Sequence, residues 1–160
     1  MRTFTLGWVV LTLMSTAACS RDIDLATSLQ VDAVSTGWFD AGIVGGKKKL
    51  VPAVSFTLKN ASDRKLPVLQ VNASFRRVGD ENEWGTAFLT AAGSGGFPPG
   101  AASGAITLRS QLGYTGIESG AEMLDNSQFV DAKVDLFAKY GSGGWTRVGE
   151  YPIARRLIAR

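Results

Sequence analysis

Histidine is absent from this sequence, and cysteine occurs only once, at Cys19. Without histidine the chain cannot form Ser-His-Asp or Cys-His catalytic arrangements, and a lone cysteine cannot close an internal disulfide or a structural zinc site. General acid–base chemistry would fall to Asp, Glu, Lys or Tyr, and no group of these residues has a catalytic arrangement in the sequence. We therefore predict that the protein is not an enzyme and has no cofactor and no metal site.

Charge of either sign is also sparse. The 17 Lys and Arg residues exceed the 14 Asp and Glu residues by three, and charged residues make up 19% of the chain. This small excess does not by itself argue for strong attraction to anionic lipid, and we predict no nucleic-acid partner. The longest basic run, Lys47 to Lys49, follows Gly45 and Gly46. We expect it at the tip of a solvated hairpin loop, with contact to anionic headgroups as the alternative.

Long hydrophobic runs are confined to the N-terminus. Arg2 provides a positive charge, residues 6–14 are apolar, and small residues follow up to Cys19. This order is typical of a secretory signal, and the apolar part is shorter than the about 20 residues that a membrane-spanning helix needs. We predict a signal peptide over residues 1–18 and export from the cytoplasm, with an uncleaved membrane anchor as the alternative.

The end of this segment, Thr16-Ala17-Ala18-Cys19, resembles the lipobox of bacterial lipoproteins. The resemblance implies that Cys19 is lipidated and becomes the mature N-terminus. It also implies that Ser20 directs the protein to the outer membrane, where it faces the periplasm. Several acyl chains on one residue form a stable anchor, so the membrane is an expected partner through this lipid. Ordinary cleavage near Ala18, which would leave a soluble periplasmic protein, is the alternative.

The rest of the chain predicts a short polar tether over residues 19–27 and a single domain over 28–160. Short segments rich in Val, Phe, Leu and Thr alternate with clusters of Gly, Asn, Asp and Pro, which is typical of an all-β fold. Apolar and polar residues alternate most clearly over 67–77 and 128–140, and a period of two excludes a helix. Further strands are predicted over 28–35, 50–59, 86–90, 105–109 and 145–151.

The short connections between these strands favour antiparallel pairing. We therefore predict an antiparallel two-sheet immunoglobulin-like β-sandwich of about seven strands, with a closed barrel as the alternative. Ser119 and Glu122 have capping-box spacing and predict one short helix near 119–126. The turn at residues 60–63, the strand after it and Pro98-Pro99-Gly100 resemble FxLYD-type immunoglobulin-like domains of bacterial envelope proteins. That resemblance implies the fold only.

Two groups of carboxylates have structural explanations. The acidic cluster at residues 80–83 lacks the ligand spacing of an EF-hand, so we expect a polar hairpin tip there. Asp131 and Asp135 fall on one face of the predicted strand, about 13 Å apart, whereas a glycosidase pair needs about 5–9.5 Å. We expect both carboxylates to be solvated.

Aromatic residues are the remaining candidates for ligand binding. Trp38, Trp84 and Tyr114 fall in or beside predicted loops, and Trp145 follows the glycine-rich turn at 141–144. Exposed rings at these positions could stack on a sugar, whereas buried rings would belong to the core. We predict an envelope lipoprotein whose β-sandwich binds or scaffolds another envelope protein. The alternative is a carbohydrate- or peptidoglycan-binding module that uses these four rings on a polysaccharide.

Overall fold

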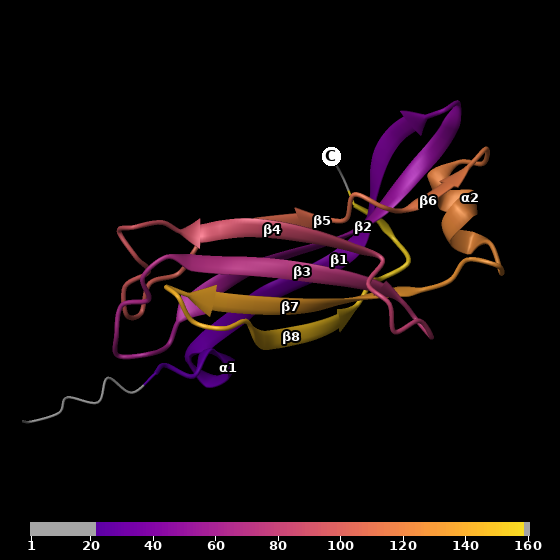
Figure 1. Cartoon of the computed structure of the whole chain (residues 1–160). Helices are drawn as coiled ribbons and strands as arrows, with labels where there is room; N and C mark the ends of the chain where they lie inside the picture. Colours follow the sequence, from indigo (N-terminus) through magenta and orange to yellow (C-terminus); the bar gives the residue numbers. More distant parts are fainter. Residues whose placement is uncertain (1–21, 159–160) are drawn as a thin grey trace, which may run out of the picture.

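The computed structural model describes residues 22–158, in which nine strands and two short helices follow one another (Figure 1). In chain order they are α1 (Leu25–Ser28), β1 (Leu29–Val44), β2 (Lys47–Asn60), β3 (Leu69–Arg77), β4 (Gly85–Ala92), β5 (Ile106–Arg109), β6 (Tyr114–Gly116), α2 (Gly120–Asp125), β7 (Ala132–Tyr140), β8 (Thr146–Pro152) and β9 (Leu157–Ile158). The predicted signal peptide and the predicted lipidation site at Cys19 lie outside the described residues. Within residues 22–158, no helix has the length and apolar character needed to cross a membrane.

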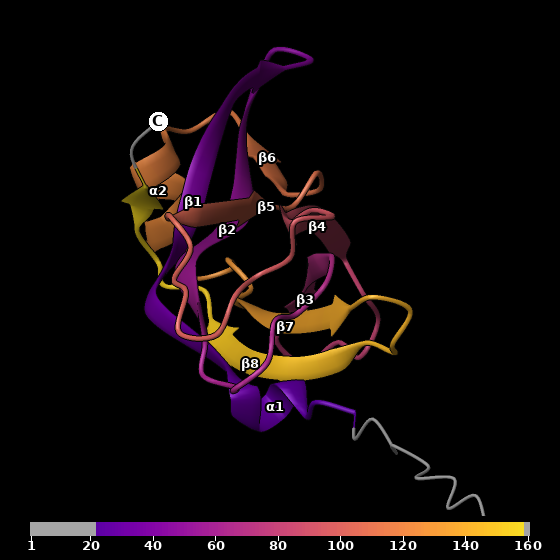
Figure 2. The ribbon, with the colours of Figure 1, turned by 90° about the vertical axis from the view of Figure 1, so that its left-hand side faces the viewer.

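The strands form two sheets that pack against each other (Figures 1 and 2). One sheet has the order β5-β2-β1-β9, with β6 also paired to β2, and the other has the order β4-β3-β7-β8. The pairs are antiparallel, except that β9 pairs in parallel with β1 at Trp38 and Phe39. The predicted all-β, antiparallel two-sheet sandwich is confirmed, and the short strands β6 and β9 are added to it.

Alternate residues of the central strands form the core of the sandwich. In β3 and β7, the side chains with no exposed surface are Leu69, Val71, Ala73, Phe75, Val134, Leu136 and Ala138. Burial of one large apolar side chain contributes about 1.5–3 kcal/mol. A slip of one residue would turn this whole set toward solvent. The period of two in the sequence therefore determines both the strands and the register between them.

β1 differs from the prediction, because it continues from the predicted strand over 28–35 to Val44. Its pairing with β2 has an irregularity between Asp32 and Ser35, where Ala33 has a φ of 51°. A residue in this left-handed region interrupts the regular ladder and re-aims the side chains that follow. Ala33, which the alternation predicts to face inward, is therefore exposed.

β7 begins at Ala132, later than the predicted strand over 128–140. The carbonyl of Asp131 accepts a hydrogen bond from the backbone N–H of Val78 at 2.7 Å, whereas the carbonyls of the two residues before it are bound by side chains. The carbonyl of Val130 accepts a hydrogen bond from the Tyr114 hydroxyl at 3.1 Å, and the carbonyl of Phe129 accepts one from Arg155 at 2.8 Å. Val130, predicted to face inward, is 43% exposed.

The predicted helix near 119–126 is confirmed as α2. Both halves of its capping box are formed by Ser119 and Glu122. The other helix, α1, was not predicted, and it lies in and just after the segment expected to be a tether. Leu25 is only 2% exposed, and the backbone N–H of Ile23 donates to the Tyr140 hydroxyl at 2.7 Å. The chain is therefore packed against the domain from Ile23 onward.

Candidate binding surface

Three of the four candidate aromatic residues belong to one cluster inside the sandwich. Trp38 is fully buried in the middle of β1. Its ring centroid lies 6.2 Å from that of Trp84, 5.6 Å from that of Tyr114 and 4.8 Å from that of Phe129. Trp84 and Tyr114 are partly buried against Trp38. We call these four residues the buried aromatic cluster.

These positions correct the expectation that Trp38 is in or beside a loop. Because β1 continues past the bulge at Ala33, Trp38 lies within a strand and points into the core. Trp84 directly precedes β4 and Tyr114 is the first residue of β6, so both stand at strand ends. Burial raises the pKa of the Tyr114 hydroxyl above its ordinary value. The cluster therefore fills the interior and offers no flat surface to a ligand.

Trp145 lies elsewhere, on the outer side of the sheet β4-β3-β7-β8. Its ring is 43% exposed and meets the ring of Phe88 nearly edge to face, with centroids 6.1 Å apart. The ammonium group of Lys139 lies 5.0 Å from the centroid of the Trp145 ring. The four candidate rings therefore do not share one solvent face.

Two phenylalanines extend the outer side of this sheet around Trp145. The β3 residue Asn72 faces Phe88 of β4 on one side and Phe137 of β7 on the other. Residues directly opposite each other across a sheet point to the same side, so both rings lie on the outer side, and Phe88 is 56% exposed. We call Phe88, Phe137 and Trp145 the aromatic face. The solvated side of an antiparallel sheet is ordinarily polar, so three aromatic rings there are unusual.

Charged residues occupy the neighbouring part of the same outer side. Asp135 is only 2% exposed and lies 3.3 Å from Arg76 and 2.5 Å from Arg147. Glu150 also contacts Arg147 and lies 3.3 Å from Lys133. The expectation that Asp135 is solvated is therefore wrong, because arginines from β3 and β8 cover it. Asp131 is exposed outside β7 and pairs with Arg155 at 2.6 Å.

β4 forms the edge of the same sheet. It pairs with β3 on one side, and none of the described strands pairs with its other side. Its eight residues, GTAFLTAA, include no charged residue and no proline. Ser110 lies against Gly85 at the start of the strand, whereas Phe88, Leu89 and Thr90 are exposed. Natural proteins usually protect an edge strand with lysine, proline or a covering loop, so most of β4 is an open edge.

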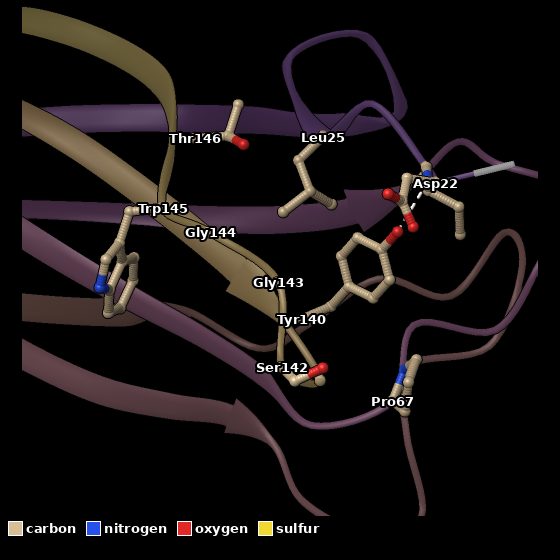
Figure 3. A pocket seen from close by; sticks show the side chains of 11 residues that line it. Asp22, Leu25, Pro67, Tyr140, Ser142, Gly143, Gly144, Trp145 and Thr146 are labelled. Carbon is tan, nitrogen blue, oxygen red and sulfur yellow. Dashed lines mark hydrogen bonds between the residues drawn. The ribbon is translucent and has the colours of Figure 1, made fainter.

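A hollow of about 580 Å³ lies at the turn end of the β7–β8 hairpin, next to Trp145 and between the N-terminal segment, Pro67 and the turn at 141–144 (Figure 3). The Tyr140 hydroxyl in its wall already accepts the hydrogen bond from Ile23. The ring of Trp145 is directed away from Leu25 and Tyr140 (Figure 3). The hollow has the size of a small-ligand site, but its lining holds a single charged side chain, Asp22. It provides no acid–base pair and no cradle for an anion.

The acidic loop between β3 and β4 has internal partners. Asp80 pairs with Arg77 at 3.0 Å and accepts a hydrogen bond from the backbone of Asn82. These interactions, the Asn82 backbone bond first, hold the pKa of Asp80 below its ordinary value. Glu83 accepts a hydrogen bond from Ser74 at 2.8 Å. Among residues 22–158, no acidic side chains converge in a group of three that would hold a metal ion.

No family model matches the chain, and no curated protein matches it. A solved structure described as the X-ray structure of Northeast Structural Genomics Consortium target SoR45 is similar over 82% of this chain and 89% of its own. The identity is 13% and the TM-score is 0.46.

The aromatic face was not identified from the sequence, although a signal for it exists. In the strand over 132–140, Phe137 falls on the polar side, between Asp135 and Lys139. In β4, Phe88 falls on the same side as Thr86 and Thr90. An aromatic residue on the polar side of an alternating strand predicts an exposed ring, and both residues could have been found in this way.

Proposed function

We propose that this protein is a membrane-tethered lipoprotein of the bacterial envelope whose β-sandwich binds another envelope protein. One observation carries this proposal: the open edge of β4 lies directly beside the exposed aromatic face. Aromatic residues are enriched at protein interfaces, where they contribute more binding energy than other residue types. An open edge offers unpaired backbone groups to an extended segment of a partner, and the adjacent rings offer contacts for its side chains.

The tether supports the same proposal. A lipid on Cys19 would leave only residues 20–22 between the membrane and Ile23. The backbone N–H of Ile23 is hydrogen-bonded to the Tyr140 hydroxyl of the domain. A domain held this close to the membrane meets its partner at a raised effective concentration. A contact of modest affinity at β4 is then sufficient for stable association in the envelope.

Site-specific cross-linking in intact cells tests the contact. A photo-reactive residue at Thr90 of β4 is expected to form an adduct with a partner protein. Thr107 of β5 is the matched control, because it is also an exposed threonine on a strand at the end of a sheet, but in the other sheet. The Phe88→Lys substitution should reduce the Thr90 adduct at least about tenfold, since it removes a ring and places a charge on the edge.

Val78→Lys is the control for that substitution, because Val78 is 55% exposed outside β4. The proposal is contradicted if Phe88→Lys and Val78→Lys have equal effects, or if Thr90 and Thr107 form the same adducts. An adduct with twice the mass of the chain would identify the partner as a second copy of this protein instead of another envelope protein.

The anchor is tested separately with Cys19→Ala. The unmodified protein should sediment with the membrane fraction and carry the mass of its acyl chains, and the variant should lose both properties. A variant that stays in the membrane with an unchanged mature mass would exclude lipidation at Cys19.

The alternative function, polysaccharide binding, depends on Trp145 alone among the four candidate rings. Sedimentation with purified peptidoglycan tests it. Retention that is lost in Trp145→Ala but kept in Phe88→Lys would favour this alternative over a protein partner.

A further inference from the structure

The hairpin of β1 and β2 extends past the other strands as a protruding ribbon (Figures 1 and 2). β1 has 16 residues and β2 has 14, whereas β3 and β7 have nine each. At about 3.3 Å per residue, β1 is roughly 20 Å longer than the strands of the opposite sheet. The ribbon ends at the opposite end of the molecule from α1 (Figure 1). We call residues 40–49 the arm.

The tip of the arm combines aliphatic and basic side chains. Gly45 and Gly46 form its turn with φ values of 58° and 77°, as a two-residue hairpin turn requires. Ile43 faces Lys48, and Val44 faces Lys47. Because paired residues share a side of the ribbon, each side of the tip carries one aliphatic side chain next to one lysine. Ile43 is 66% exposed and Val44 is 51% exposed.

β6 adds a third aliphatic residue to this group. Gly116 of β6 faces Lys48 of the arm, and Ile117 follows it with 85% of its surface exposed. Single exposed aliphatic residues are normal in soluble proteins. Three of them beside one protruding turn are a concentrated apolar surface that the fold does not bury.

The charge of the arm favours an anionic partner. Residues 40–49 contain three lysines and one acid, Asp40, so their net charge is +2. Lys48 pairs with Asp40 at 2.7 Å, and the ammonium group of Lys49 donates to the backbone carbonyl of Gln111 at 2.8 Å. Lys47 is exposed at the turn. Glu118, next to Ile117, is an acid near the tip and reduces but does not cancel this charge.

We propose that the arm binds the surface of an anionic lipid bilayer. Ile43, Val44 and Ile117 enter the interface between headgroups and acyl chains, and the lysines contact lipid phosphates. Each basic residue near an anionic membrane surface strengthens binding about fivefold. The tip is a narrow convex ribbon, which fits a fluid surface that can deform around it.

Together with the proposed lipid anchor, this contact defines an orientation. The 16 residues of β1 span roughly 50 Å between α1, where the expected tether begins, and the tip of the arm. Contact at both ends lays the long axis of the sandwich along the membrane. This orientation depends on the anchor, whereas the affinity of the arm for lipid does not.

Vesicle binding tests the affinity of the arm without the lipid. A chain of residues 20–160 keeps every described strand and the whole described core, so we expect it to fold without the preceding segment. It is expected to float with phosphatidylcholine vesicles that contain phosphatidylglycerol, and to stay unbound with phosphatidylcholine alone. Binding should weaken as salt increases, because screening reduces the contribution of the lysines.

Matched charge variants assign the binding to the arm. Lys47→Gln with Lys48→Gln should weaken binding to the anionic vesicles about 20-fold. Lys59→Gln with Lys65→Gln removes the same charge from exposed positions away from the tip and should change binding less than about twofold. Equal losses in both variants would overturn the proposal. No flotation of the unmodified chain would also overturn it, and would favour an acidic protein surface as the partner of the arm.

A fluorescent label tests insertion directly, since residues 20–160 contain no cysteine. Val44→Cys, labelled with an environment-sensitive dye, should shift to shorter wavelength on anionic vesicles. Ser142→Cys, on the β7–β8 turn, should not shift. A Val44 label that reports water in the presence of bound vesicles excludes insertion of the tip, as does an equal shift at both positions.

Discussion

The buried aromatic cluster and the aromatic face use the same residue types for opposite purposes. Trp38 has no exposed surface and touches three other rings, whereas Trp145 is 43% exposed and touches Phe88 and Lys139. The first group holds the two sheets together at one end of the sandwich. The second group lies on the outside of one sheet and adds little to the core. This contrast separates stability from function: removal of a ring from the cluster should destabilise the fold, and removal of a ring from the face should leave stability nearly unchanged and impair binding.

The largest expected effect is that of Trp38→Ala. Removal of a fully buried ring that packs on Trp84, Tyr114 and Phe129 should cost about 3–5 kcal/mol of unfolding free energy. Urea denaturation followed by circular dichroism measures this cost. A loss below about 1 kcal/mol would show that the cluster collapses around the gap and does not hold the two sheets together.

Asp135→Ala should have the next largest effect. It leaves Arg76 and Arg147 without their shared carboxylate, and breaking a fully buried pair costs about 3–5 kcal/mol. Both guanidinium groups are partly solvated, so we expect about 2 kcal/mol. Asp131→Ala, which breaks the exposed pair with Arg155, is the control and should cost less than about 1 kcal/mol. Equal losses in the two variants would mean that Asp135 does not organise the outer side of its sheet.

Trp145→Ala should change stability little. The ring has one edge contact with Phe88 and one contact with the Lys139 ammonium group, so its removal should cost about 1 kcal/mol or less. The same denaturation experiment, run beside Trp38→Ala, gives the ratio of the two effects. A Trp145→Ala cost as large as that of Trp38→Ala would remove the distinction between the cluster and the face.

The smallest effect concerns pH. Burial raises the pKa of Tyr114, and that of Tyr151, above the ordinary value of 10.0. Above about pH 10 the unfolded chain releases these protons while the folded chain keeps them, so the unfolding free energy should fall as pH rises. Tyr114→Phe should reduce this slope. Unfolding midpoints between neutral pH and pH above 10 measure it, and a slope that is unchanged in Tyr114→Phe would show that Tyr114 titrates as in the unfolded chain.

Much of the fold follows from local sequence patterns. The alternation in β3 predicted its buried apolar residues, although not the burial of Ser74, and the spacing of Ser119 and Glu122 predicted α2. These patterns are readable because strand and helix periods act between residues close together in the chain. The local alternation does not predict the bulge at Ala33. Trp38 is a core residue because β1 continues past this bulge.

The candidate surface depends more strongly on contacts between distant residues. Asp135 is buried because β3 and β8 bring Arg76 and Arg147 over it, and the edge position of β4 results from the order of the strands. The alternation of residues within one strand predicts neither the partner of a carboxylate nor the position of the strand in its sheet.

The sequence by itself determined the all-β class, the apolar residues of the central strands that face the core, and α2. It also determined that few catalytic arrangements are available to a chain without histidine. The tertiary structure alone decided which of the four candidate rings are buried, which sheet edge is open and how far the β1–β2 arm protrudes. The physical reason is that burial in a sandwich is shared between strands far apart in the chain. A ring such as that of Trp145 becomes exposed or buried only when its neighbours are in place.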